Sequence, residues 1–255
     1  MKVFLVNLPQ DKERLANVDA RLRELRVFYE RVNGVYGADV SGEGRHQLVN
    51  QYRWWCAVGR PMTDGELGCA LSHAKIYRKI VELGLPCACV LEDDVVLDDR
   101  FPMVLNAVAE RANAEKSQVF LLSNHSMSDG QIGNEHEGYR TKEGMVEPSF
   151  IRSDGDFYTE GYVVTLRAAE MLLRVNVPIK TPCDWWFRWA KLGAIELYHA
   201  FPTVCYQNKT AYQSHTENQK ALPVSEWPLC EYCWHKFSRV VGKGIDAFLM
   251  CILGT

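Results

Sequence analysis

Three adjacent carboxylates, Glu92, Asp93 and Asp94, directly follow the apolar run "CACVL" at residues 87–91. Two unit charges about 4 Å apart repel by roughly 4 kcal/mol at a protein-like dielectric constant, so this cluster is costly unless something neutralises it. A bound cation would neutralise it, and so would shared protons that leave some of the acids uncharged. A solvated turn, in which water screens the charges, is the third interpretation.

The position of the three acids favours the cation. The run before them predicts a central strand of an α/β sheet, and open α/β sheets bind ligands outside the carboxyl ends of their strands. Because side chains alternate along an extended segment, we expect Glu92 and Asp94 to face one side and Asp93 the other. The pair Glu92 and Asp94 then offers oxygen ligands to one hard divalent cation.

The apolar periodicity predicts the elements that position this cluster. A strand at 2–8, a helix within 9–26 and a strand within 27–35 make a β-α-β start, which favours a parallel sheet covered by helices. A helix is predicted from Thr63 or Asp64, as N-cap, to Gly84. The remaining expected elements are a helix at 102–114, a strand at 118–123, a strand and a helix within 159–175, and a short helix within 181–193.

Two segments show no clear period. Residues 36–62 carry glycines, charges and "RWW", and we expect a long loop or irregular insertion there. Residues 124–149 are polar and glycine-rich, which predicts a long loop or a hairpin excursion of the kind that is often functional or mobile. We expect one domain over 1–233 and a separate tail over 234–255.

Composition excludes some functions. The chain has 255 residues and a net charge of -3, without a basic stripe interleaved with aromatic residues, so we expect no nucleic-acid partner. The N-terminal apolar run is too short for a signal peptide, and no segment has the roughly 18 apolar residues that cross a bilayer. Together with nine cysteines in mostly apolar surroundings, this predicts a cytoplasmic protein with reduced thiols. Cys230 and Cys233 form a C-x-x-C near His235, and two unlinked thiols are favoured there over a structural zinc site, which needs a fourth ligand.

Residues 65–97, "GELGCALSHAKIYRKIVELGLPCACVLEDDVVL", resemble the signature of glycosyltransferase family 25: G-E-x-G-C-x-x-S-H, a helix, and an apolar strand ending in E-D-D. The segments "VNLPQDKER", "TEGYVVTLRAAEMLL" and "TPCDWWF" are similar to further family elements, so the resemblance covers roughly residues 1–215. Members of this family build bacterial lipooligosaccharide, and relatives glycosylate collagen. The resemblance implies an α/β fold of GT-A type, with a Rossmann-like, mostly parallel central sheet flanked by helices in a single domain.

The resemblance also implies a reaction. An inverting enzyme would move galactose or glucose from a UDP-sugar to a glycan hydroxyl, with lipooligosaccharide or lipopolysaccharide core as the expected acceptor on the cytoplasmic face. The E-D-D triplet resembles the D-x-D motif, so Mn²⁺ or Mg²⁺ is the expected cofactor and stabilises the departing nucleoside diphosphate. Asp94 is the main expected metal ligand, Glu92 assists, Asp93 contacts the metal or the ribose, and His215 is a candidate third ligand.

Two further residues are catalytic candidates. Asp184, next to Trp185 and matching the family's P-x-D element, is the expected base that deprotonates the acceptor, and Trp185 is expected to stack on a sugar ring. The alternative for Asp184 is a helix N-cap. His73 is expected to orient donor or acceptor hydroxyls and is the reserve candidate for the base, whereas an isolated histidine at this position is more often a hydrogen-bonded core residue.

Four polar residues are expected to bind substrate. Asn7 and Arg14 lie at the end of the first strand and on the next helix, where the uridine and diphosphate would approach, although Arg14 also suits a solvated helix surface. Ser72 precedes His73 in the family's S-H pair. Gln207 lies in a polar segment near the expected third metal ligand.

Two rival functions stay open. A metal-dependent phosphohydrolase would use the same acidic cluster on water, but the chain shows no second group of acids and histidines for a two-metal site. A catalytically silent sugar-binding protein is the other rival. The tail 234–255 carries apolar residues at helical spacing, which predicts an amphipathic helix. This helix either lies on an anionic membrane beside a lipid-linked acceptor or packs on the protein's own core.

Overall fold

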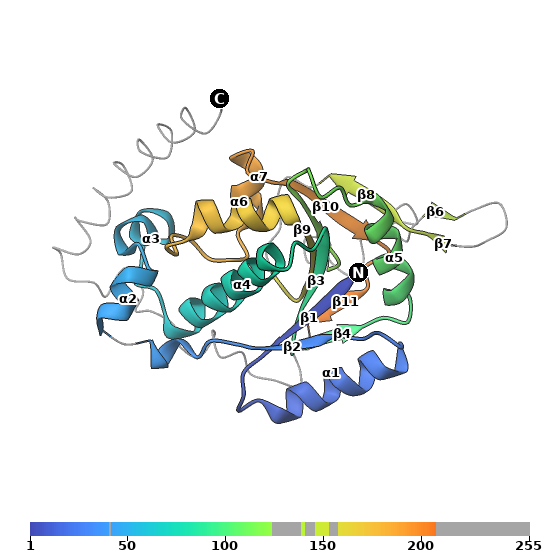
Figure 1. Cartoon of the computed structure of the whole chain (residues 1–255), viewed down its shortest axis with the longest axis horizontal. Coiled ribbons are helices and arrows are strands. Elements are labelled where there is room, and N and C mark those ends of the chain that lie inside the picture. Colours follow the sequence, from blue (N-terminus) through green and yellow to red (C-terminus); the bar gives the residue numbers. More distant parts are fainter. Residues whose placement is uncertain (41, 124–138, 141–145, 153–157, 208–255) are drawn as a thin grey trace.

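The described part of the chain is built around a seven-stranded sheet (Figure 1). The computed structural model describes residues 1–207 except 41, 124–138, 141–145 and 153–157. The strand order is β2-β1-β3-β9-β5-β10-β8, with β1 at Lys2–Asn7, β2 at Glu30–Asn33, β3 at Cys87–Glu92, β5 at Gln118–Leu121, β8 at Ser149–Arg152, β9 at Gly161–Thr165 and β10 at Glu196–Phe201.

The sheet is mixed but mostly points one way. β1 is parallel to β2 and to β3, and β5 is parallel to β10. β9 is antiparallel to both β3 and β5, and β8 is antiparallel to β10. Five of the seven strands therefore share one direction, which confirms the predicted α/β class with a central sheet flanked by helices.

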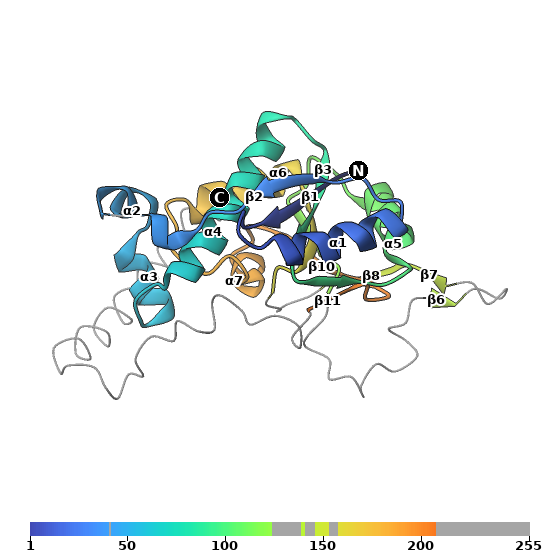
Figure 2. The same ribbon diagram turned by 90° about the horizontal axis from the view of Figure 1, so that it is seen from below.

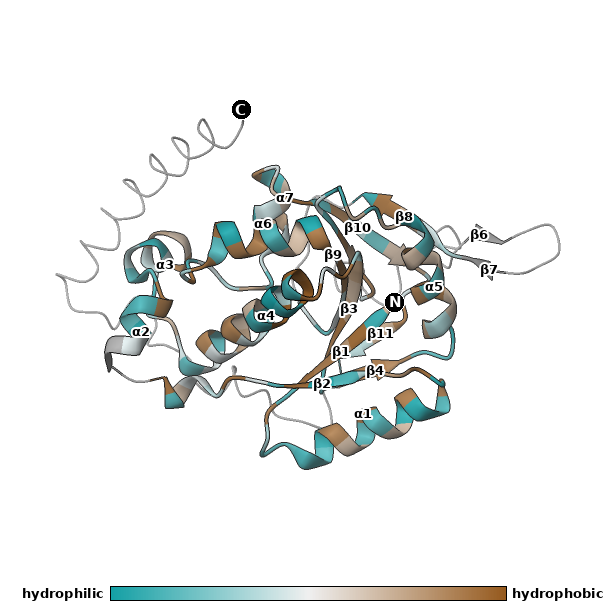
Figure 3. Ribbon diagram, in the orientation of Figure 1, coloured by the Kyte–Doolittle hydropathy of each residue, from teal (hydrophilic) through white to brown (hydrophobic). Residues whose placement is uncertain are grey.

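Helices cover both faces of this sheet (Figures 1 and 2). Because successive side chains of a strand point to opposite faces, Phe4 and Leu5 of β1 belong to two different core clusters. Figure 3 shows the hydrophobic residues of the central strands lying between the helices. The first cluster packs against α4 (Asp64–Glu82), α6 (Leu166–Asn176) and α7 (Trp186–Lys191), and the second against α1 (Lys12–Glu24) and α5 (Phe101–Arg111).

Helix α4 begins as the sequence predicts. The Thr63 side chain accepts a hydrogen bond from the Glu66 amide, and the Glu66 carboxylate accepts one from the Thr63 amide, which is a complete capping box. Gly84 follows the helix with a φ of 59°, a left-handed conformation that glycine adopts without a Cβ penalty. These two features define where α4 begins and ends.

Residues 36–62 are more regular than expected. In place of a long loop they form η1 (Gly37–Asp39), α2 (Gly42–Leu48) and α3 (Gln51–Val58). The Asn50 side chain caps α3 by accepting a hydrogen bond from the Arg53 amide, and Gly59 ends the helix with a φ of 83°. Trp54 of α3 is fully buried. The prediction was wrong because helices of seven and eight residues are too short to show an apolar period.

The smaller elements complete the described chain. β4 (Val95–Leu97) pairs antiparallel with β11 (Cys205–Gln207), and β6 (Tyr139–Arg140) pairs antiparallel with β7 (Val146–Glu147) inside the segment expected to be a loop or hairpin. Within the described residues no helix combines the length and apolar character that a membrane span requires. The expected domain boundary at 233, the tail 234–255, the Cys230–Cys233 pair and His215 lie outside the described residues, and the predictions about them stay predictions.

Candidate active site

A cavity of about 820 Å³ lies at the carboxyl ends of β1 and β3, beside the first turns of α4 and the loop before α7. This is the edge of the sheet where open α/β folds bind ligands. Every predicted site residue within the described part of the chain lines this cavity: Asn7, Arg14, Ser72, His73, Glu92, Asp93, Asp94, Asp184, Trp185 and Gln207.

The acidic triplet is at the turn that follows β3. The strand ends at Glu92, and Asp93 and Asp94 form the turn, so the expected alternation of sides does not extend through all three residues. All three acids line the same cavity. Asp93 is only 8% exposed, which contradicts the interpretation of the triplet as a solvated turn.

Asp93 is held by the first strand and helix. Its Oδ2 atom accepts a hydrogen bond of 2.7 Å from the Asn7 side-chain amide, and its Oδ1 atom lies 3.4 Å from Nη1 of Arg14. Burial raises the pKa of Asp93, while Asn7 and Arg14 oppose that rise. Arg14 has a side-chain exposure of 12%, so it is a charge turned into the cavity rather than a solvated helix residue.

Asp94 is the least compensated of the three acids. Burial, followed by repulsion from Glu92 and Asp93, raises its pKa to about 7. Within the described residues, no hydrogen-bond donor reaches its buried Oδ1 atom. An unpartnered buried carboxylate oxygen beside two further carboxylates fits a hard divalent cation, whose ligands are oxygens. The residues present therefore suit the Mn²⁺ or Mg²⁺ that the sequence predicts.

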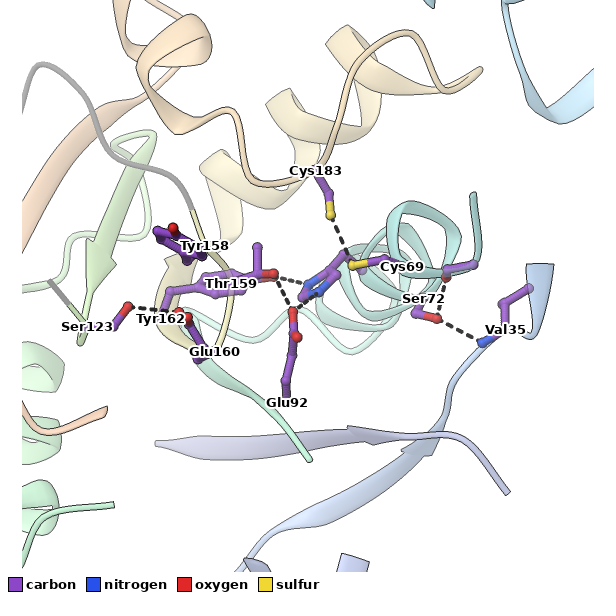
Figure 4. Close-up of polar contacts among 12 residues, drawn as sticks. Val35, Cys69, Ser72, Glu92, Ser123, Tyr158, Thr159, Glu160, Tyr162 and Cys183 are labelled. Carbon is purple, nitrogen blue, oxygen red and sulfur yellow. Dashed lines mark hydrogen bonds and ion pairs between the residues drawn. The ribbon is translucent and has the colours of Figure 1, made fainter. Parts of the chain in front are cut away.

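Glu92 belongs to a buried hydrogen-bond network (Figure 4). Its Oε1 atom lies 3.0 Å from Nε2 of His73 and accepts a hydrogen bond from the Thr159 hydroxyl. The Nδ1 atom of His73 lies 2.7 Å from the Tyr162 hydroxyl, which in turn lies 2.9 Å from the Tyr77 hydroxyl. The network joins α4 to β3 and β9, and the Glu92 carboxylate is held by His73 of α4 and by Thr159 in the loop before β9.

This network sets the charges of its members. Burial alone lowers the pKa of His73, but hydrogen bonds with Cys69 and Glu92 outweigh it and raise that pKa to about 10. Burial alone raises the pKa of Glu92, and the bond to His73 reverses this, so the pKa is lowered. The two side chains thus form an ion pair in which His73 is buried and the Glu92 side chain is 25% exposed. His73 is 1% exposed with both ring nitrogens in hydrogen bonds, which suits a residue that positions Glu92.

Ser72 shapes the wall of the cavity. Its hydroxyl donates to the Gly68 carbonyl at 2.6 Å and accepts from the Val35 amide at 2.8 Å. A Cβ atom on Gly68 would lie 2.5 Å from the Val35 carbonyl oxygen, so only glycine permits this close approach. In this structure Ser72 therefore binds the chain segment at Val35 to α4, and its predicted contact with substrate stays a prediction.

Asp184 enters the cavity from the loop before α7. The N-cap position of α7 is Trp185, without a side-chain cap bond, so the alternative assignment of Asp184 as the helix cap is wrong. Burial raises the pKa of Asp184 to about 6. Such a carboxyl group is mostly ionised at neutral pH and still basic enough to take a proton, which suits a general base.

The structure also shows cavity residues that sequence reasoning missed. Arg60 forms a two-pronged salt bridge with Glu66 at 2.8 and 2.5 Å on the cavity wall. The Sγ atoms of Cys69 and Cys183 lie 3.3 Å apart. The cysteine in "GELGC" and the cysteine in "TPCD" were visible in the sequence, but a separation of 114 residues carries no local signal that they meet.

The family model described as "Glycosyltransferase family 25 (LPS biosynthesis protein)" matches residues 1–187. The chain belongs to glycosyltransferase family 25. The matched region contains the acidic triplet, His73 and Asp184, and it ends before Gln207. The family suspected from the signature block is thereby confirmed.

The curated relatives of this family 25 chain include procollagen galactosyltransferases and also proteins whose names call them inactive. Procollagen galactosyltransferase 1-A of Xenopus laevis is 28% identical over 244 residues, covering 92% of this chain and 36% of the relative. Procollagen galactosyltransferase 1 of Danio rerio is 31% identical over 190 residues, covering 70% and 29%. The probable inactive glycosyltransferase 25 family member 3 of Bos taurus is 34% identical over 176 residues, covering 68% and 28%. The chain thus spans about a third of the length of these relatives.

Proposed function

We propose that this family 25 chain transfers a hexose from a UDP-sugar to a hydroxyl of a glycan, with inversion at the anomeric carbon. The observation that carries the proposal is Asp94, a half-buried acid with a buried, unpartnered oxygen, in a cavity that also contains Arg14 and Asp184. The names of the relatives favour galactose over glucose as the hexose. The family description favours a lipopolysaccharide or lipooligosaccharide core as acceptor.

The donor end of the site would hold the nucleoside diphosphate. Asp94 is the main expected ligand of Mn²⁺ or Mg²⁺, with Glu92 and His215 as further candidates. This cation supplies positive charge to the leaving diphosphate. Arg14 adds a guanidinium suited to phosphate oxygens, and Asn7 and Asp93 are the expected contacts for the nucleoside.

The acceptor end would use Asp184. The acceptor hydroxyl oxygen forms a bond to the anomeric carbon, and its proton passes to the Asp184 carboxylate. The bond between the anomeric carbon and the diphosphate oxygen breaks, and its electron pair leaves with the diphosphate. A general base of this kind typically contributes about 10²–10⁴ in rate. Trp185, next to Asp184 and on the cavity wall, offers an aromatic face for the acceptor ring.

Assays of transfer and hydrolysis decide among the three candidate functions. The purified chain is incubated with UDP-galactose and Mn²⁺, with and without a lipooligosaccharide-core acceptor, and with a generic phosphomonoester. The proposal expects acceptor-dependent transfer that stops when a chelator removes the cation. Phosphate release from the monoester would instead support the phosphohydrolase. Binding of UDP-galactose without turnover would support a silent sugar-binding protein, a function favoured by the relatives that are named inactive.

The tail extends the proposal to the membrane. An amphipathic helix at 234–255 would place the active site beside a lipid-linked acceptor at the cytoplasmic surface. We predict that the full chain floats with anionic vesicles and that a chain truncated at Trp234 does not. Equal flotation of both chains would remove the tail from membrane binding.

A further inference from the structure

Two cysteines in the cavity have no part in the proposed reaction, and they lie beside His73. Cys69 and His73 lie four residues apart on α4, so they project from the same face of the helix. Cys183 approaches them from the loop before α7 (Figure 4). The Sγ atoms of the two cysteines are 3.3 Å apart, and ligand atoms of all three residues lie within 4.8 Å of one another.

The donor set of this cluster differs from that of the acidic triplet. Two sulfur atoms and an imidazole nitrogen are the ligands preferred by Zn²⁺ and similar soft cations, whereas carboxylate oxygens suit Mg²⁺ and Mn²⁺. Three protein ligands leave a fourth position for water, as in zinc sites that are open to a cavity. All three residues line the cavity, so a cation and its water have access to them.

We propose that Cys69, His73 and Cys183 form a binding site for Zn²⁺, separate from the acidic triplet, and that occupation of this site inhibits the enzyme. Binding converts both thiols to metal-bound thiolates and removes one ring proton from the His73 imidazolium, and these protons are released to solvent. The inhibitory part rests on the proposed transferase function, whereas the binding part does not.

The hydrogen bonds of His73 give the mechanism of inhibition. Its two ring nitrogens are engaged by Glu92 and Tyr162, so a nitrogen that binds the metal must give up one of these partners. Loss of the Glu92 bond removes one of the two contacts that hold the Glu92 carboxylate, and loss of the Tyr162 bond removes the contact that orients the His73 ring toward Glu92. The metal also fixes the loop at Cys183, whose next residue is the proposed base Asp184. A displacement of about 1 Å in such a site is enough to cost about 10²-fold in rate.

Metal binding is tested with Co²⁺ in place of Zn²⁺, because cobalt bound to thiolate gives a charge-transfer absorption. The titration uses a full-length chain in which Cys230→Ser and Cys233→Ser remove the C-x-x-C of the tail. We expect one Co²⁺ per chain, displaced by Zn²⁺ and not by excess Mg²⁺. Cys69→Ser and Cys183→Ser should each abolish the band, whereas Cys87→Ser, a half-buried cysteine at the start of β3, should keep it.

Circular dichroism of each variant shows that a lost band does not come from a lost fold. A band that persists in both Cys69→Ser and Cys183→Ser would overturn the site. So would a freshly purified chain whose two thiols are already joined in a disulfide, since a disulfide cannot supply thiolates.

Inhibition is tested separately on the transfer reaction in saturating Mn²⁺. We expect added Zn²⁺ to lower the rate at least about 10-fold, and a chelator selective for Zn²⁺ to restore it. The rate of Cys183→Ser, whatever its own value, should not respond to Zn²⁺. A chain that binds Co²⁺ as expected and keeps its full rate in Zn²⁺ would overturn the inhibitory role. Failure of the transferase proposal itself would leave the cobalt titration unaffected, so the two outcomes are distinguishable.

Discussion

Asp94→Asn should make the protein more stable at alkaline pH, because Asp94 is an acid that the folded chain holds in an unfavourable setting. Burial and the neighbouring carboxylates raise the pKa of Asp94 from 3.8 to about 7. Between these values the folded state binds more protons at this group than the unfolded state does. The free energy of unfolding therefore falls as the pH rises through this range, and the loss is complete above about pH 7. Asparagine has no ionisation, so the variant escapes this loss.

The size of the effect follows from the same pKa. Each unit of pKa difference corresponds to about 1.4 kcal/mol. From about pH 5 to about pH 8, the stability advantage of Asp94→Asn over the wild type should therefore grow by on the order of 2–3 kcal/mol. Most single substitutions destabilise, so a stabilising change at a cavity residue is an unusual outcome and a sharp test.

Urea unfolding at both pH values, in a chelator, measures this difference. Glu110→Gln on the exposed side of α5 is the matched control and should show no such growth between the two pH values. Saturating Mn²⁺ at about 100 times its dissociation constant should stabilise the wild type by about 2.7 kcal/mol and Asp94→Asn much less. An equal advantage of Asp94→Asn at both pH values would refute the reasoning, because it would show that Asp94 is not an ionised acid under strain.

Three further predictions concern the cavity. Asp184→Asn should lower kcat by at least about 10²-fold with little change in donor affinity, and the wild-type rate should fall below about pH 6 as Asp184 takes up a proton. Arg14→Met should weaken UDP binding in calorimetry by about tenfold if one charge-assisted bond to phosphate is lost, whereas Arg23→Met, on a side chain that is 79% exposed, should not. Gly68→Ala should destabilise the fold by about 1–3 kcal/mol in urea unfolding, because its Cβ meets the Val35 carbonyl oxygen, whereas Gly44→Ala meets nothing and should be tolerated.

The parts of the fold that were predictable from sequence are those with local signals. The capping box at Thr63 and Glu66 and the regular apolar stripe after it predict α4 almost to the residue. The apolar run before Glu92 predicts β3, and it also predicts that the three acids lie at the carboxyl end of a central strand. A strand's apolar character does not reveal its direction, however, so the antiparallel insertion of β9 between β3 and β5 had no visible signal.

The parts of the site that were not predictable depend on distant contacts. His73 meets Tyr162 across 89 residues, and Cys69 meets Cys183 across 114 residues. Neither contact follows from spacing along one helix or strand. Alternation along an extended segment also failed at Asp94, because the chain turns after Glu92 and brings successive acids to one cavity.

The negative charges of Glu92, Asp93 and Asp94 have different partners in the fold, and this difference affects how a cation and a donor diphosphate would bind. Glu92 is paired with His73, and Asp93 with Asn7 and Arg14, whereas the buried Oδ1 atom of Asp94 has no hydrogen-bond donor among the described residues and the pKa of Asp94 is raised to about 7. A donor diphosphate that entered the cavity without a cation would add negative charge beside Asp94 and meet repulsion. A cation bound at Asp94 removes that repulsion, so cation and donor should each raise the affinity for the other by the same factor. For the proposed transferase we therefore expect the donor site to bind a nucleotide only together with its metal.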